Sequence, residues 1–178
     1  MYRAALITGG AKRLGRELAL ALARRKINVV VHYNRSLDEA TETVEQALSY
    51  GVKAVSLQAD LLNLQASRDL VVRASKALGQ PLDVLVNNAS IFEYDRLDTV
   101  TPEGWDRHIN SNLRAPLFLT QAFGAQVPEA ISDENNEVKA TSAVINIVDQ
   151  RVRKLTPDFM TYTIAKMGLW AFTQTAAR

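Results

Sequence analysis

The chain of 178 residues is 47% hydrophobic and 22% charged, with 21 basic and 19 acidic residues and a net charge of +2. It is long enough to bury a core, and its small charge imbalance includes no basic block that would predict nucleic-acid binding. It has no cysteine, and His32 and His108 are isolated, so we expect neither a disulfide nor a metal site.

No apolar run reaches the length of a membrane span. Met1-Tyr2-Arg3 leads straight into a strand-like segment, without the pattern of a signal peptide. We therefore expect a cytoplasmic protein that binds neither nucleic acid nor membrane, with one domain over residues 1–178.

Short apolar runs alternate with amphipathic stretches along the chain. Apolar character and β-branched residues predict five buried strands, at Ala4–Thr8, Val29–Val31, Ala54–Ala59, Val84–Val86 and Ala143–Val148. Helices are predicted at Leu14–Arg25, Ser36–Tyr50, Asn63–Leu78, from Thr101-Pro102 onwards, and at Met160–Ala177. This alternation predicts an α/β fold, a doubly wound parallel sheet of the Rossmann type with helices on both faces.

Local signals mark the ends of several elements. Ser36 to Glu39 form a capping box, and Gly51 and Gly79 can end helices through a left-handed backbone. The polar stretch Ser132–Glu137 lacks apolar periodicity, so we expect a solvated surface loop there.

A glycine-rich turn, Thr8–Gly15, joins the first strand to the first helix. Its glycines permit a tight turn, and the N-terminus of the helix offers free N–H groups and a positive dipole end to a pyrophosphate. An ordinary turn would also contain glycines, but the strand–turn–helix context favours phosphate binding.

The segment Tyr33-Asn34-Arg35-Ser36 follows the second strand, where an NAD-binding domain carries an acid that bonds the ribose diol. Arg35 and Ser36 stand there instead, with Arg13 close by, and a guanidinium would bind a 2′-phosphate. This favours NADP over NAD, although Arg35 could also be a solvated loop residue and Ser36 only a cap.

Tyr162 and Lys166 lie four residues apart, on one face of the last helix. A nearby ammonium is expected to lower the pKa of the phenol and make it a proton donor near neutrality. The pattern also occurs by chance on many helices. Asp149 ends the fifth strand, and its spacing alone favours an ordinary loop aspartate.

Pro116 has no N–H and cannot bond the carbonyl of Asn112. That carbonyl is then released for a water or a lysine, and the same proline would explain a simple helix kink.

Together these residues resemble the short-chain dehydrogenase/reductase family along the whole chain. The resemblance is carried by the glycine-rich turn, Asn87-Asn88-Ala89, Asn112, and Tyr162 with Lys166. Within the family the chain is most similar to the pteridine reductases. Four details carry this similarity: Arg13 in place of the middle glycine, His32-Tyr33-Asn34-Arg35-Ser36, Ser90 followed by Phe92, and Asp149 in place of the catalytic serine.

The resemblance implies roles for these residues. Tyr162 would donate a proton, Lys166 would lower its pKa and hold the nicotinamide ribose, and Asn112 would bind a relay water. Asp149 would bond Tyr162 and serve a second proton delivery. Phe92 would stack on a pterin, with Ser90 and Arg13 nearby. NADP(H) would be bound by Gly9, Arg13, Leu14, Gly15, Tyr33, Asn34, Arg35, Ser36, Asp60, Leu61, Asn88, Ala89 and Ser90.

The implied reaction is NADPH-dependent hydride transfer to a small molecule, an oxidised or dihydro pterin or folate. One alternative is a reductase of a ketone such as a 3-oxoacyl thioester or a sugar. Asp149 argues against it, because a serine hydroxyl normally bonds the substrate carbonyl. Another alternative is a non-catalytic nucleotide-binding protein, against which Asn112, Tyr162 and Lys166 argue.

Family members continue beyond the helix that carries Tyr162, so the resemblance implies a C-terminally truncated fragment whose last strands are missing. We expect the full-length form to be a homo-oligomer, a dimer or a tetramer. Alone, the fragment would expose the edge of Ala143–Val148 and be loosely packed or insoluble, and catalytically silent.

Overall fold

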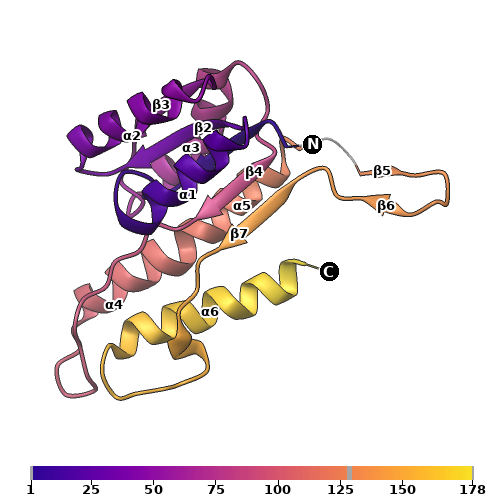
Figure 1. Ribbon diagram of the computed structural model, residues 1–178. Helices are drawn as coiled ribbons and strands as arrows, with labels where there is room; N and C mark the ends of the chain where they lie inside the picture. Colours follow the sequence, from indigo (N-terminus) through magenta and orange to yellow (C-terminus); the bar gives the residue numbers. More distant parts are fainter. Residues whose placement is uncertain (1, 128–129, 178) are drawn as a thin grey trace.

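The structure, a computed structural model, describes residues 2–127 and 130–177 and contains a central sheet of five parallel strands (Figure 1). Their order across the sheet is β3-β2-β1-β4-β7. The strands are β1 (Ala4–Ile7), β2 (Asn28–Tyr33), β3 (Ala54–Gln58), β4 (Val84–Asn87) and β7 (Ala143–Asn146). The predicted doubly wound parallel sheet is confirmed, and each predicted strand overlaps an observed one. Met1 and Arg178, the ends of the expected domain, lie outside the described residues.

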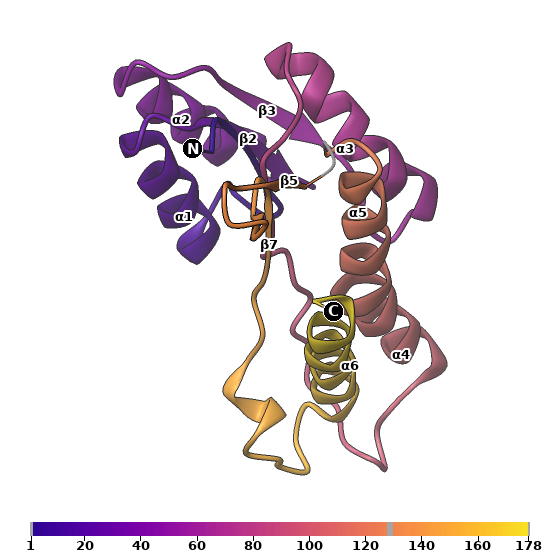
Figure 2. The ribbon, with the colours of Figure 1, turned by 90° about the vertical axis from the view of Figure 1, so that its right-hand side faces the viewer.

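Helices cover both faces of this sheet (Figure 2). The helical segments are α1 (Arg13–Arg24), α2 (Leu37–Ser49), α3 (Leu64–Leu78), α4 (Pro102–Ile109), the π-helical turn η1 (Asn110–Arg114), α5 (Ala115–Gly124), the 3-10 turn η2 (Gln150–Val152) and α6 (Met160–Ala176). Successive strand residues face opposite sides, so Leu6 and Leu85 pack with α3 and α5, whereas Ile7 and Val86 pack with α1 and α2. The sheet is therefore packed between two apolar cores, one on each face, and the site is built at the carboxyl ends of its strands.

Most predicted helix ends are confirmed. The side chain of Asn63 accepts a hydrogen bond from the Ala66 N–H at 3.0 Å, and that of Thr101 caps α4 at Gly104. Gly51 and Gly79 have φ values of +75° and +71° after α2 and α3, as their left-handed role requires.

The capping box predicted at Ser36 is wrong. The Ser36 hydroxyl makes no capping hydrogen bond, because its backbone (φ −96°, ψ 65°) is not in the extended conformation usual for a cap. The backbone carbonyl of Ser36 does take part in the hydrogen bonding of α2, because it accepts the N–H of Ala40 at 3.1 Å. Ser36 itself lines the groove described below.

The solvated surface loop predicted at Ser132–Glu137 is ordered as a turn between two short strands. This segment forms the turn of a small antiparallel hairpin between β5 (Ile131–Ser132) and β6 (Val138–Lys139), which projects from the body of the molecule (Figure 1). A carboxylate oxygen of Asp133 accepts the N–H groups of Asn135 and Glu137, and this local turn permits pairing without an apolar pattern.

The chain runs helically from α4 through η1 into α5, although Pro116 lies near the start of α5. The wider turn η1 bonds the Ala115 N–H to the carbonyl of Asn110, which accommodates the proline without ending the helix. α6 packs against α4 and η1. In the described parts of the chain, no helix has both the length and the apolar character that a membrane crossing requires.

Candidate active site

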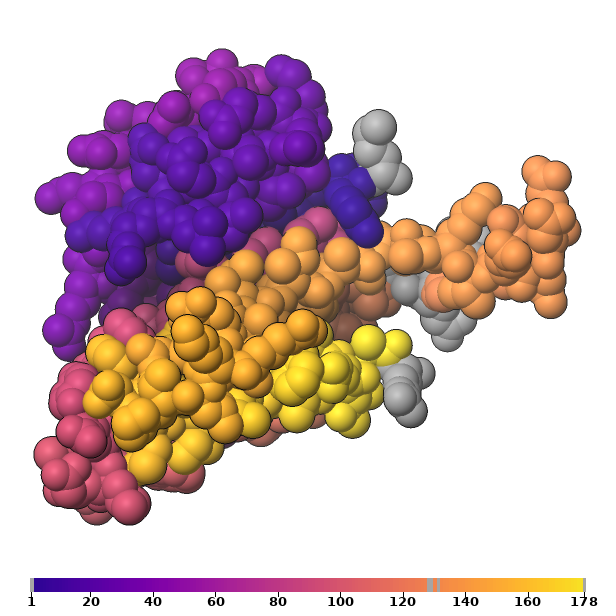
Figure 3. All heavy atoms as spheres, turned by 60° about the horizontal axis from the view of Figure 1, so that its bottom comes forward, coloured from indigo at the N-terminus to yellow at the C-terminus, as the bar shows by residue number. Residues whose placement is uncertain are grey.

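The carboxyl ends of the parallel strands open onto one groove, as expected for a doubly wound sheet. It consists of two adjoining cavities of about 400 and about 590 Å³, which share several lining residues, among them Gly9, Lys12 and Ser90. In the surface view of Figure 3, the indigo N-terminal part lies opposite the orange and yellow C-terminal segments. The larger cavity is lined from both sides, by the turn after β1 and by Ile147–Asp149 with α6. Every residue predicted to bind cofactor or substrate or to transfer a proton lines this groove, except Asn112.

The glycine-rich turn is held in place by close backbone contacts. Gly9 has a φ of +62°, which a residue with a side chain rarely adopts. A Cβ on Gly15 would lie 2.1 Å from the Gly9 carbonyl oxygen, so only glycine fits there. The Asn88 side-chain amide donates to the carbonyls of Thr8 and Gly9, which ties the turn to the end of β4.

The N-terminus of α1 meets the requirements of a phosphate cradle. Its cap residue, Lys12, makes no side-chain capping bond, and its first turn carries no acid. The N–H groups of that turn are thus available, with the positive end of the helix dipole, to an anion in the groove. Arg13 and Leu14 line the same cavity.

His32, on β2, supports the glycine-rich turn through a hydrogen bond. Its Nδ1 accepts the N–H of Gly9 at 3.0 Å, so Nε2 carries the proton and donates to the carbonyl of Ala59 at 3.1 Å. The side chain is only 2% exposed, and this burial lowers the pKa of His32 to about 4. The imidazole therefore stays neutral, and protonation would turn its Nδ1 into a donor facing another donor.

This burial predicts an acid-dependent loss of stability. His32 has a pKa of about 4 in the folded chain and about 6.5 when unfolded, so the unfolded state binds more protons between these values. The free energy of unfolding should fall by about 3 kcal/mol from this residue as pH falls through that window, and should be unaffected by it above about pH 7. Denaturant unfolding of the wild type and of His32→Asn, which cannot ionise, measures the difference. Equal pH slopes for the two proteins would contradict the assignment.

The end of β2 and the start of α2 form the other end of the groove, where Tyr33, Asn34, Arg35 and Ser36 all lie. Among the described residues, Arg35 makes no ion pair, so its guanidinium is available to a ligand. Asp60 and Leu61, from the segment after β3, complete this cavity, and Asn34 donates to Asp60 at 3.4 Å.

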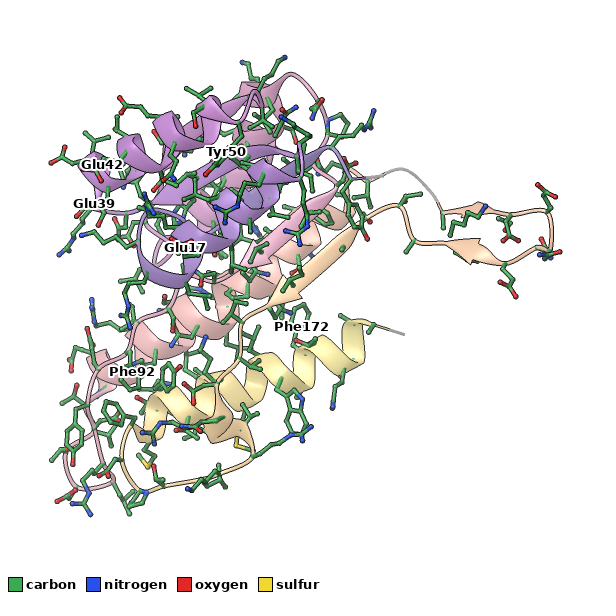
Figure 4. The ribbon with its side chains drawn as sticks, in the orientation of Figure 1. Glu17, Glu39, Glu42, Tyr50, Phe92 and Phe172 are labelled. Atoms are coloured by element: carbon green, nitrogen blue, oxygen red, sulfur yellow. The ribbon has the colours of Figure 1, made fainter. Side chains whose placement is uncertain are left out.

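Lys12 is a groove residue that the sequence reasoning missed. Its ammonium pairs with Glu39 at 2.5 Å and lines both cavities, close to the predicted phosphate sites. Figure 4 labels Glu39 at the start of α2. The sequence contains a signal for it, because Lys12 lies in the glycine-rich turn directly before α1, where a cation would be close to a bound phosphate.

Tyr162, Lys166 and Asp149 meet at the opposite end of the groove. The Tyr162 hydroxyl donates to Asp149 Oδ2 at 3.2 Å, while Asp149 Oδ1 accepts the N–H of Arg151 at 2.9 Å and caps η2. Lys166 donates from Nζ to the carbonyl of Ile147 at 2.8 Å and lies 5.7 Å from the centre of the Tyr162 ring. Asp149 is therefore an oriented partner of the phenol.

The expected lowering of the Tyr162 pKa is wrong for this structure. Burial and then the negative charge of Asp149 raise the pKa of Tyr162 to about 12. Burial also lowers the pKa of Lys166 to about 8, against the opposing charge of Asp149. The phenol is thus held protonated, and the ammonium is the group of the pair that titrates near neutrality.

Asn112 is placed differently from the other predicted residues. It is fully buried, and its side chain forms two hydrogen bonds with the backbone of Ile91, accepting the N–H and donating to the carbonyl, both at 2.8 Å. The Asn112 side chain therefore fixes the segment that carries Phe92 and does not line the groove.

Phe92 belongs to an aromatic cluster at the mouth of the site (Figure 4). One ring face stacks on Phe159, with centroids 4.2 Å apart and planes at 8°, and Tyr162 meets the ring edge-on at 4.7 Å. Phe92 is nevertheless 54% exposed, so a large apolar surface remains open to the groove.

A doubly wound sheet whose glycine-rich turn faces a buried Tyr–Lys pair defines the class of Rossmann-fold oxidoreductases. A family model described as short chain dehydrogenase matches residues 3–178, so the chain belongs to the short-chain dehydrogenase family.

Two solved structures are similar to this chain over nearly all of it. The FolM alternative dihydrofolate reductase 1 of Brucella canis, crystallised with NADP, is 38% identical, with a TM-score of 0.88, covering 98% of this chain and 65% of that one. A short chain dehydrogenase of Burkholderia cenocepacia, also with NADP, is 30% identical, with a TM-score of 0.87, covering 99% and 67%.

Among curated proteins, the 3-oxoacyl-[acyl-carrier-protein] reductase FabG of Staphylococcus epidermidis is 30% identical over all 178 residues of this chain, which cover 69% of that protein. The chain thus spans about two-thirds of the length of these relatives.

Proposed function

We propose that this protein is an NADPH-dependent reductase of pterin-like rings in which Tyr162 donates the proton. The observation that carries the proposal is the hydrogen bond from the Tyr162 hydroxyl to Asp149, at the end of a groove lined by Phe92. The 38% identity to the FolM protein supports it.

The groove fits a dinucleotide with an additional phosphate. The turn at Gly9 and Gly15, which packs too closely on neighbouring residues to admit a Cβ at Gly15, leads into the free N–H groups of α1 that would hold the pyrophosphate. Asn88 and Ala89 would border the nearby ribose. Arg35, Ser36 and Lys12 line one cavity and would surround a 2′-phosphate, and Asp60 with Leu61 would border the adenine. Lys166 would hold the nicotinamide ribose.

When bound, NADPH would supply the hydride for the carbon of a substrate C=N bond, and would thereby be oxidised to NADP⁺. The chain supplies the proton that the substrate nitrogen takes up. Tyr162, whose pKa is about 12, stays protonated at neutral pH and can donate from its hydroxyl. Asp149 accepts a hydrogen bond from that hydroxyl, and after the transfer it would take up a proton from solvent and pass it to the phenolate. Lys166 would compensate the charge while it remains an ammonium.

The substrate would lie against Phe92, whose exposed ring matches a planar heteroaromatic ring. Ser90 and Arg13 line the same cavity and would bond its polar edge. Asn112 would act through the Ile91 backbone, which sets the position of Phe92.

A second candidate is a 3-oxoacyl thioester reductase, favoured by the similarity to FabG over the whole chain. Asp149 speaks against it, because a carboxylate at 3.2 Å from the Tyr162 oxygen cannot donate a hydrogen bond to a ketone unless it is protonated.

The test is a comparison of substrates with the purified full-length form, because we expect the fragment alone to be catalytically silent. NADPH oxidation is followed with dihydrobiopterin, dihydrofolate and an acetoacetyl thioester, after thermal-shift measurement with NADPH and NADH. Turnover of a pterin or folate with selective stabilisation by NADPH is expected. Turnover of the thioester alone would establish the second candidate, and cofactor binding with no turnover of any of them would favour a non-catalytic nucleotide-binding protein.

The cofactor assignment predicts a selective effect of Arg35→Ala. Loss of one charged contact to a desolvated phosphate costs about 1.5–3 kcal/mol, so NADPH affinity should fall by roughly 10- to 150-fold. NADH affinity should change little, because it has no 2′-phosphate. Titration of cofactor fluorescence measures both, with Arg25→Ala, an exposed arginine at the far end of α1, as the control. Equal weakening of both cofactors would show that Arg35 does not contact the 2′-phosphate.

A further inference from the structure

The first turn of α6, which carries Tyr162, is capped from a distant part of the chain. Its own cap residue, Phe159, has a left-handed backbone with φ +56° and makes no side-chain capping bond. Asp95, in the loop between β4 and α4, takes over this role. Its backbone carbonyl accepts the N–H groups of Phe159 at 2.8 Å and Met160 at 3.4 Å, and its Oδ1 accepts that of Thr161 at 3.2 Å.

The cap is part of a buried series of hydrogen bonds in which each group donates to the next, from His108 through Thr161 to Asp95. Nε2 of His108 accepts the N–H of Glu93 at 3.1 Å, so the neutral ring carries its proton on Nδ1. That nitrogen lies 2.7 Å from the Thr161 hydroxyl and donates to it, and the hydroxyl in turn donates to Asp95 Oδ2. His108, Thr161 and Asp95 are respectively 1%, 0% and 7% exposed, so water does not replace these bonds.

This series of hydrogen bonds joins three elements around Tyr162. His108 lies on α4, Thr161 on α6, and Asp95 in the loop that also carries Phe92 (Figures 1 and 2). Thr161 directly precedes Tyr162, and the rings of His108 and Tyr162 meet edge-on at 6.2 Å. A shift of the first turn of α6 would move the phenol relative to Asp149 and Phe92.

We propose that Asp95, Thr161 and His108 form a positioning network that sets the phenol of Tyr162 within the groove. The expected effect of the network on catalysis rests on the proposed function. Its role in holding the start of α6 does not. The three are positioning residues, because none of them lines the groove.

Matched substitutions test the network. Thr161→Val keeps the shape of the side chain but removes the hydroxyl, whereas Thr161→Ser keeps the hydroxyl. Asp95→Asn keeps the shape of the side chain but replaces one carboxylate oxygen with an NH₂ group. That group donates, so it cannot accept the hydrogen bond from the Thr161 hydroxyl. Amide hydrogen exchange of the α6 N-terminal peptide, NADPH affinity, kcat and KM are measured for each in the purified protein.

In Thr161→Val and Asp95→Asn we expect exchange at the start of α6 to become roughly tenfold faster and kcat to fall roughly tenfold. NADPH affinity and KM should stay within about twofold, and Thr161→Ser should behave like the wild type. Unchanged exchange in both variants, or a valine variant that matches the serine variant, would overturn the proposal. If the wild type reduces no substrate, the proposed function fails, and exchange alone still decides whether the network holds α6.

Discussion

Replacing Tyr162 with phenylalanine is expected to lower kcat for pterin reduction by about 10²- to 10⁴-fold, the range typical of a lost proton donor. The ring packing against Phe92 and His108 is retained, so only the hydroxyl and its bond to Asp149 are removed. NADPH affinity should change little, because the phenol is not part of the phosphate cradle. Steady-state kinetics with a fluorescence titration of NADPH separates the two effects.

Tyr50→Phe is the matched control, since the Tyr50 hydroxyl, at the end of α2 (Figure 4), accepts hydrogen bonds from Arg24 of α1 and Gln46 of α2, outside the groove. Full activity of Tyr162→Phe would remove this residue from the mechanism.

Asp149→Asn provides an independent readout. It should lower kcat and also lower the pKa of Tyr162, because the Asp149 charge helps to raise that pKa. An ultraviolet titration of the phenol follows the second change.

Gly15→Ala is expected to abolish cofactor binding and to destabilise the fold. The new Cβ would lie 2.1 Å from the Gly9 carbonyl oxygen and 2.5 Å from the Asn88 side-chain nitrogen, so the turn and the end of β4 would have to separate. Overpacking at such a rigid site costs typically 1–3 kcal/mol or more, a large part of a net stability of about 5–15 kcal/mol. Denaturant unfolding and a thermal-shift assay with NADPH measure both losses.

Gly124→Ala is the control for this substitution, because a Cβ at the end of α5 meets no atom within 4 Å. It should leave stability unchanged or raise it by up to about 1 kcal/mol, since alanine favours a helix over glycine. Normal NADPH binding by Gly15→Ala would show that the turn does not form the cradle described above.

Much of the fold follows from local patterns. The strands β1, β2 and β4 are runs of apolar and β-branched residues that suit a fully buried parallel sheet, and their positions are therefore visible in the sequence. Asn63, Thr101 and Gly79 act on backbone groups within a few residues, so their effects are also local. Ser36 has the right neighbours for a cap, but its backbone (φ −96°, ψ 65°) is not extended, and its hydroxyl makes no capping bond.

The site divides in the same way. The glycine-rich turn and the Tyr162–Lys166 pair are local motifs, so the sequence by itself locates them. The contact between Asp149 and the phenol is implied by the family resemblance but not by spacing along the chain. Only the tertiary structure decided that burial raises the pKa of Tyr162 and that Asp95 caps α6 from another segment. These outcomes depend on which residues far apart in the chain become neighbours and how much water they exclude, and neither quantity is set by spacing along the sequence.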